Sequence, residues 1–111
     1  MAKGDHVGEF EHLVLLAVLR LGEDAYGAAI RREIEGRTGR SLTVGALHRT
    51  LDRLEAKGFV SSRVGDPTPE RGGRSKRYFR LRPIAMRSLR ESHDALAAMW
   101  DGLEAQVPRR A

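Results

Sequence analysis

The spacing of apolar side chains changes along this chain of 111 residues, and that change limits the folds open to it. Up to Gly58, apolar residues recur every three or four positions, as in helices. Residues 59–64 and 75–82 instead have the composition of strands, and in the second Phe79 and Leu81 alternate with Tyr78 and Arg80. After Pro83 the helical spacing returns. The sequence therefore predicts a mostly helical α+β fold: three helices, a β-hairpin and a last helix.

The first two predicted helices differ in how much apolar surface they carry. Residues 9–21 are apolar nearly all round, so we expect more than one face of this helix to be covered. A second helix is expected at about 25–36, where Asp24 can cap its start and Gly36 and Gly39 end it. One face of this second helix carries its apolar residues: Tyr26, Ala29, Ile30 and Ile34.

A third helix is predicted at about 43–57, capped by Ser41 or Thr43 and ended by Gly58. Its expected buried stripe consists of Val44, Leu47, Leu51 and Leu54. The opposite side carries Gly45, Arg49, Asp52, Arg53 and Ala56, with His48 on a flank. One face is thus free to meet a partner.

The positive charge of the chain is concentrated in one stretch. The formal net charge is +5, and residues 1–58 and 83–111 are each neutral. Residues 59–82 hold the excess: Arg63, Arg71, Arg74, Lys76, Arg77, Arg80 and Arg82, against two acids. Between the strands, residues 65–74 are rich in Pro and Gly and too long for a tight turn. Such a basic stretch indicates a polyanionic partner, although a solvated charged surface would have the same composition.

The last predicted helix begins at Pro83 and runs to about 105. Its apolar seam fills positions at alternating steps of three and four: Met86, Leu89, His93, Leu96, Trp100, Leu103 and Val107. This seam could fold back on helix 9–21 or pair with the same helix of a second copy. The apolar surface of the first helix favours both at once, in a two-fold dimer.

Three helices followed by a hairpin is the order of elements in a winged helix-turn-helix domain. The second and third helices would form the helix-turn-helix, linked by residues 36–42. The third would enter the major groove and bring Thr43, Gly45, His48, Arg49 and Arg53 near double-stranded DNA. Each arginine could read guanine or contact phosphate. The hairpin would be the wing, with Arg71, Arg74, Lys76 and Arg77 against the phosphate backbone or minor groove.

Three stretches resemble the PadR family of bacterial transcriptional regulators, in its short form with one C-terminal helix. They are residues 25–27 (AYG) with Ile30, residues 43–60 (TVGALHRTLDRLEAKGFV) and residues 72–81 (GGRSKRYFRL). The similarity covers about residues 9–104, and it departs from the family at His48, where Tyr is usual. It implies a homodimeric repressor of an inverted-repeat operator, with an effector bound near the dimer interface.

For several side chains the sequence allows either a ligand-binding role or a packing role. Trp100 could be a platform for an aromatic or hydrophobic effector, or plain packing of a dimer core. Met99 could help form such a pocket, and Tyr26 is either an effector contact or a core or interface residue. His12 and His93 are expected to pack or hydrogen-bond. The four histidines lack metal-ligand spacing and the chain has no cysteine, so we expect no metal site and no cofactor.

Other functional classes find little support. No catalytic motif is present, so we do not expect an enzyme. The longest apolar run, residues 13–19, is far shorter than the roughly 20 residues of a membrane span. A soluble cytoplasmic protein, nucleoid-associated when bound to DNA, is therefore expected. The remaining alternative is a winged-helix adaptor that binds proteins without sequence-specific DNA binding. The expected parts are a flexible N-terminus (1–8), a DNA-binding domain (9–82), a dimerisation helix (83–107) and a tail (108–111).

Overall fold

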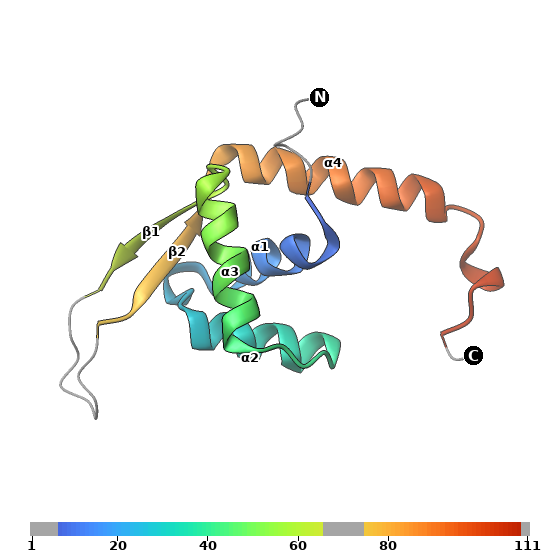
Figure 1. The fold of residues 1–111 in the computed structure, drawn as a ribbon. Coiled ribbons are helices and arrows are strands. Elements are labelled where there is room, and N and C mark those ends of the chain that lie inside the picture. The colour runs from blue at the N-terminus through green and yellow to red at the C-terminus, as the bar shows by residue number, and fades with distance from the viewer. Residues whose placement is uncertain (1–6, 66–74, 110–111) are drawn as a thin grey trace.

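The computed structural model describes residues 7–65 and 75–109. Helices pack around α1, and a two-stranded antiparallel sheet projects to one side (Figure 1). The elements are α1 (Glu9–Leu21), η2 (Gly22–Asp24), α2 (Gly27–Thr38), α3 (Val44–Ala56), β1 (Val60–Val64), β2 (Arg77–Leu81), α4 (Pro83–Trp100) and η3 (Glu104–Gln106). The predicted winged helix-turn-helix architecture with a C-terminal helix is confirmed.

Helix α1 lies at the centre of the body because α2, α3, β2 and α4 all pack on it. Val14 and Leu15 are fully buried, as the nearly all-round apolar sequence of α1 predicts. Leu16 and Leu19 nevertheless stay exposed. The largest fully buried side chains come from α1, α2, α3 and the residue before β1: Leu15, Ile30, Leu47, Leu51, Leu54 and Phe59. One face of α1 therefore remains without a cover in a single chain.

Helix α2 begins later than its sequence predicts, and Asp24 does not cap it. Tyr26 is the N-cap, and Asp24 belongs to the short η2 turn. The cause is tertiary: the Phe79 N–H donates to the Ala25 carbonyl at 2.8 Å, and Tyr26 forms an isolated bridge with Tyr78. This pairing with the wing keeps residues 25–26 extended. Ala29, Ile30 and Ile34 are buried as expected, and the helix ends at Gly39, whose φ of 73° suits glycine.

Helix α3 has the bounds and the cap expected for it. The Ala46 N–H donates to Thr43 Oγ1 at 3.0 Å, which satisfies one of the free donors at the helix start. Leu47, Leu51 and Leu54 are buried, but Val44 is 52% exposed, so the expectation that it joins the stripe is wrong. Val44 is the first helical residue, and it lies at the rim of a groove between α2 and α3.

The hairpin presents two different faces because alternate residues of a strand point opposite ways. Arg63 lies directly opposite Tyr78 in the register, and Ser62 lies opposite Phe79. The face bearing Ser62 and Phe79 is turned to α3, since Ser62 Oγ donates to Glu55 at 2.7 Å. The face bearing Arg63 and Tyr78 is turned to the start of α2. Arg63 therefore lies beside aromatic rings at the start of α2, whereas Arg77, on the other face, lies beside the acids of α3.

Helix α4 ends at Trp100, several residues before the predicted end near 105. Asp101 is extended and Gly102 has a φ of 82°, so the chain turns away there. Leu103 and Val107, which the three- and four-residue spacing predicts on the seam of this helix, consequently lie beyond its end. The first turns of α4 are packed on the body through Ala85, Ser88 and Leu89, whereas every residue from His93 to Trp100 is exposed.

The packed body starts before α1. Val7 is buried in the core, and the Gly8 N–H donates to Glu11 Oε1 at 3.0 Å in a capping arrangement. These two residues were expected within a flexible segment, 1–8. They are held because Val7 covers apolar core surface and Glu11 accepts from the turn.

Candidate nucleic-acid interface

The exposed side of α3 carries four of the residues that the sequence predicts near DNA. Thr43, Gly45, His48 and Arg49 are all exposed and lie in the first half of the helix. A Cβ added to Gly45 would lie 3.4 Å from Arg49 Nη1, so the guanidinium lies back along the helix over Gly45. The glycine thus leaves room for the Arg49 guanidinium beside the helix backbone.

Arg53, the fifth predicted residue of α3, is engaged within the protein. Its Nε donates to Glu11 Oε2 of α1 at 3.0 Å, and Lys57 Nζ lies 3.1 Å from both oxygens of the same carboxylate. Glu11 is only 7% exposed, so this acid is buried between α1 and α3. Arg53 therefore fixes α3 on α1, a role that the spacing of Arg49 and Arg53 on one face does not reveal.

The pKa of the Glu11 carboxyl is lowered by this arrangement. Burial by itself raises that pKa, but hydrogen bonds from the Gly8 N–H, Arg53 and Lys57 outweigh the cost of burial. A charged carboxylate with three donors is stable where an unpaired one would not be.

The predicted basic residues of the wing divide into three groups. Arg71 and Arg74 lie outside the described residues. Arg77 is turned to α3, where its Nη1 lies 3.2 Å from Asp52 Oδ1 and its Nη2 pairs with Glu55. Lys76, unlike Arg77, makes no ion pair with a carboxylate of the described residues. Arg77 thus connects the wing to α3, and its positive charge is balanced by acids of α3.

A cluster of aromatic rings and cations joins the wing to the start of α2. Tyr26 and Tyr78 meet edge to face, with ring centroids 5.7 Å apart. Lys76 Nζ lies 4.2 Å from the Tyr26 centroid, and Arg32 Nη2 donates to the Tyr26 hydroxyl at 3.1 Å. On the other ring, the Arg63 guanidinium lies 4.6 Å from the Tyr78 centroid.

This cluster polarises the Tyr26 hydroxyl. The hydrogen bond from Arg32 lowers the pKa of the Tyr26 phenol below 10.0, and nearby Lys76 adds to the effect against a smaller cost of burial. The sequence predicts Tyr26 as a core, interface or effector residue and gives Arg32 no role. The cross-strand position of Tyr78 opposite Arg63 was the one signal that could have revealed half of the cluster.

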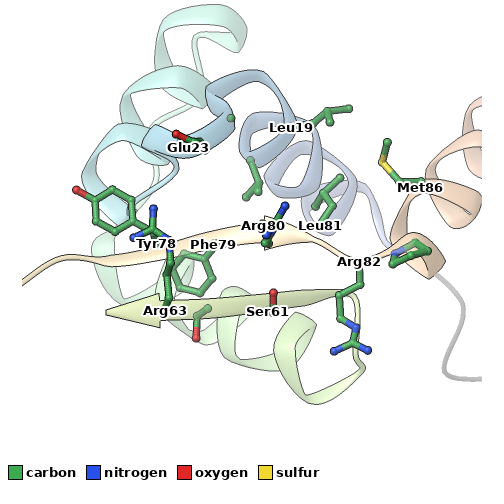
Figure 2. A pocket seen from close by; sticks show the side chains of 14 residues that line it. Leu19, Glu23, Ser61, Arg63, Tyr78, Phe79, Arg80, Leu81, Arg82 and Met86 are labelled. Atoms are coloured by element: carbon green, nitrogen blue, oxygen red, sulfur yellow. The ribbon is translucent and has the colours of Figure 1, made fainter. Parts of the chain in front are cut away.

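A hollow lies on the same face of the hairpin, between the end of α1 and the start of α4. Figure 2 shows Leu19 of α1 and Met86 of α4 on its two sides, with Arg80 and Leu81 of β2 between them. Arg63 and Tyr78 line the end of the hollow that lies away from α4. Leu19 and Met86 are each 48% exposed, so the hollow extends the uncovered apolar face of α1 onto α4.

The predicted seam of α4 is exposed beyond its first turns. Leu89 is buried within the chain, whereas Leu96 is 58% and Trp100 43% exposed. Leu96, Trp100 and His93 line a groove together with His12 and Leu13 of α1. Burial lowers the pKa of His12, and the nearby charge of His93 lowers it further. The rest of the predicted seam is exposed as well: Met86, Leu103 and Val107.

The three predicted effector contacts are not brought together within one chain. Met99 and Trp100 are the last residues of α4, whereas Tyr26 is the N-cap of α2 and contacts Tyr78 of the wing. The end of α4 and the start of α2 lie on opposite sides of the molecule (Figure 1). Within residues 7–65 and 75–109, no group of three His, Cys, Asp or Glu side chains could hold a metal ion. In the same residues, every helix is too short or too polar to cross a membrane.

One family model matches most of the chain. Residues 15–91 match the family model described as "Transcriptional regulator PadR-like family". No curated protein matches the chain. A PadR family transcriptional regulator from Eggerthella lenta is 27% identical, with a TM-score of 0.64 over 86% of this chain and 82% of that one.

Two further solved structures share the fold. A transcriptional regulator from Clostridium thermocellum has a TM-score of 0.71 at 19% identity, over 88% of this chain and 89% of that one. A PadR family transcription regulator from Clostridium difficile has a TM-score of 0.69 at 17% identity, over 85% and 94%.

Proposed function

Because this chain belongs to the PadR-like family of transcriptional regulators, we propose that it is a homodimeric repressor that binds an inverted-repeat operator. DNA-binding regulation of transcription is the function of the family, and the finer assignment rests on this chain's own surface. The two α3 helices of a dimer would enter successive major grooves about 34 Å apart. The protein would work in the cytoplasm, associated with the nucleoid when bound.

The observation that carries the proposal is the state of Arg49. It is exposed on α3, it lies over Gly45, and it pairs with no described carboxylate, whereas Arg53 and Arg77 are bound to acids of the protein. An exposed arginine without an ion pair in the first half of α3 suits bidentate recognition of guanine. Thr43, Gly45 and His48 border it on the same half of the helix, and the wing with Lys76 supplies contacts to the backbone.

The distribution of exposed apolar side chains supports the dimer. Most of the large exposed hydrophobic residues among the described ones lie on α1, on α4 or just after α4: Leu16, Leu19, Met86, Leu96, Met99, Trp100, Leu103 and Val107. Exposed apolar side chains concentrated on two elements are typical of an interface. We assign it to pairing of α4 and α1 with those of a second copy, His93 included.

The groove beside Trp100 is the place we propose for an aromatic or hydrophobic effector. Its walls are Leu13 of α1 and Leu96 and Trp100 of α4, whereas Met99, the residue before Trp100, does not line it. A ligand there would act on the spacing of the two DNA-binding heads only by binding one dimer arrangement more tightly. Trp100→Ala separates the two roles of the ring: lost effector response with unchanged dimerisation would assign it to the effector.

Fluorescence anisotropy tests the proposed function. Wild type and Arg49→Ala are titrated with a duplex from the region upstream of the gene and with a scrambled duplex, across a salt series. Wild type should prefer the upstream duplex by about 10³-fold or more. Arg49→Ala should lose about 1–3 kcal/mol on that duplex and much less on the scrambled one.

Each other outcome has a definite meaning. Equal losses on both duplexes would make Arg49 a phosphate contact and remove its role in base reading. Equal, steeply salt-dependent binding of both duplexes by wild type would contradict binding of an operator in that region. Absence of binding at low salt would replace the repressor with the protein-binding adaptor.

A further inference from the structure

The hollow between α1, the hairpin and α4 carries positive charge that the chain does not balance. Arg63, Arg80 and Arg82 all line it, and none of the three forms an ion pair with a carboxylate of residues 7–65 and 75–109. Among the described residues that line the hollow, Glu23 alone is acidic. The hollow therefore suits a partner that brings negative charge.

The same hollow has apolar walls that water reaches. Leu19 of α1 and Met86 of α4 are each 48% exposed and stand on its two sides, with Leu81 of β2 between them (Figure 2). Burial of such side chains is favourable, so the partner should be apolar as well as acidic.

The segment that follows α4 has this complementary composition. Residues 101–107, here called the terminal segment, carry Leu103 and Val107, which are 42% and 52% exposed. Between and before these two lie Glu104 and Asp101, and neither acid pairs with a cation of the described part of the chain. Apolar and acidic side chains thus stand together without a cover.

The terminal segment is folded although nothing covers it. The Leu103 N–H donates to the Trp100 carbonyl at 2.8 Å, and the Gln106 N–H donates to the Leu103 carbonyl at 2.9 Å. Every residue from Asp101 to Val107 is nevertheless exposed. A short turn that presents its leucine to water is preorganised to pack on another surface.

Within one chain the terminal segment and the hollow lie too far apart to meet. The hollow is at the first turn of α4, and the terminal segment follows the last turn, about 27 Å further along this helix of 18 residues. Figure 1 shows the hairpin and the C-terminal segment on opposite sides of the molecule. In a two-fold dimer with antiparallel α4 helices, however, the end of one α4 meets the start of the other, and the contact is made twice.

We propose that the terminal segment of each copy docks in the hollow of the other. Leu103 packs between Leu19 and Met86. The carboxylate of Glu104 pairs with Arg80. The inference rests on the dimer of the proposed function and adds the hairpin to its interface, so that each wing is held by the second copy as well as by its own α3.

A charge exchange tests the docking by sedimentation without DNA. Arg80→Glu and Glu104→Arg should each raise the dissociation constant of the dimer about tenfold, because each places like charges together. The variant with both substitutions should return close to wild type. Arg37→Glu is the matched control, since it makes the same change on the exposed end of α2 and should leave the dissociation constant unchanged.

A disulfide cross-link tests the same contact without any change of charge. The chain has no cysteine of its own, so Leu19→Cys combined with Leu103→Cys introduces the two thiols of the experiment. Oxidation should join two chains in a non-reducing gel, because the docking brings the two positions within the roughly 7 Å between Cα atoms that a disulfide spans. Val44→Cys combined with Leu103→Cys is the control and should stay at the mass of one chain, since Val44 is exposed on α3.

The outcomes separate the docking from the proposed dimer. A dimer whose dissociation constant is unchanged in Arg80→Glu and Glu104→Arg, with no cross-link through residues 19 and 103, would overturn the docking, leave the dimer in place and open the hollow to a small anionic ligand. Weakening in both single variants without recovery in the combined one would overturn it too, because the two charges would not meet. A wild type that is monomeric would overturn the dimer and the docking together, whereas its preference for the upstream duplex is measured independently.

Discussion

Glu11 shows how a single buried acid can decide the position of the helix that meets DNA. Its carboxylate accepts from the Gly8 N–H, from Arg53 of α3 and from Lys57, the C-cap residue of α3. The three donors thus come from the residue before α1 and from the C-terminal end of α3. A shift of α3 along α1 would break these bonds and leave a buried charge uncompensated, which is costly.

We predict that Glu11→Gln lowers the free energy of unfolding at pH 7 by about 1–2 kcal/mol, a modest value because Arg53 and Lys57 are partly solvent-exposed. The folded-state pKa of Glu11 lies below its ordinary value of 4.5. Its contribution is therefore complete above pH 4.5 and is lost as the pH falls through the folded pKa. The difference between variant and wild type should accordingly shrink in strong acid.

Urea unfolding at a series of pH values measures this difference. Glu23→Gln is the control, because Glu23 is exposed in η2 and should give the same stability as wild type at pH 7. A Glu11→Gln deficit that stays constant from pH 7 down to pH 3 would contradict an electrostatic origin and point to altered packing.

At the scale of elements, the wing is fixed to α3 through one arginine. Arg77 of β2 binds Asp52 and Glu55 of α3, and its Nε lies 3.2 Å from Ser62 Oγ of β1. Three elements thus meet at a single guanidinium, whose five donors in a fixed fork suit such a junction. The orientation of the wing relative to α3 is set at this point.

We predict that Arg77→Gln costs about 1 kcal/mol or less in urea unfolding, because the junction is partly exposed. In DNA titrations its salt slope should remain near that of wild type, since the charge of Arg77 is already matched by Asp52 and Glu55. A slope reduced by about 0.9, as expected for a lost phosphate contact, would show instead that Arg77 binds the backbone.

The sequence predicts these elements well where local signals decide them. The bounds of α1 and α3 follow from apolar spacing, glycines and the Thr43 cap. The start of α2 does not, because the wing, some fifty residues later in the chain, keeps Ala25 and Tyr26 extended. Helix and strand propensities depend on the residue itself and do not include pairing with a distant segment.

The same limit applies to the basic residues. The sequence predicts Arg53 near DNA because it lies one turn from Arg49 on the same helix face, and Arg77 because it belongs to the basic hairpin. Their acidic partners lie 42 residues away for Arg53 and 22 and 25 residues away for Arg77. Net charge counts do not show which cations are matched in space. Arg49, whose surroundings are local to α3, was placed correctly on the exposed face.

At the scale of the molecule, α4 extends away from the body (Figure 1). The large apolar side chains of its second half, Leu96, Met99 and Trp100, are exposed. Its first turns pack on α1, so the rest is held in place as an exposed arm. Burial of a leucine or tryptophan side chain is worth about 2 kcal/mol or more, so this arm gains stability from a second copy.

Substitution of Leu96 by Glu tests that gain. Leu96 is 58% exposed in the single chain, so Glu at this position leaves the core untouched, but in a dimer the charge would be buried without a partner. We predict that wild type sediments at about twice the chain mass of 12.4 kDa and that Leu96→Glu sediments as the monomer. Ala98→Glu adds the same charge two residues along, off the seam, and should remain dimeric.

Loss of the dimer carries a consequence for DNA. A monomer holds one α3, so Leu96→Glu should bind an inverted repeat and a single half-site with similar affinity, whereas Ala98→Glu should prefer the repeat strongly. Thermal unfolding with an unchanged cooperative transition would show that each Leu96→Glu chain is still folded. If Leu96→Glu sediments with wild type as a dimer, the partner covers another face of the molecule. If wild type is itself a monomer, the seam of α4 is not a dimer interface, and recognition of an inverted repeat by two α3 helices fails with it.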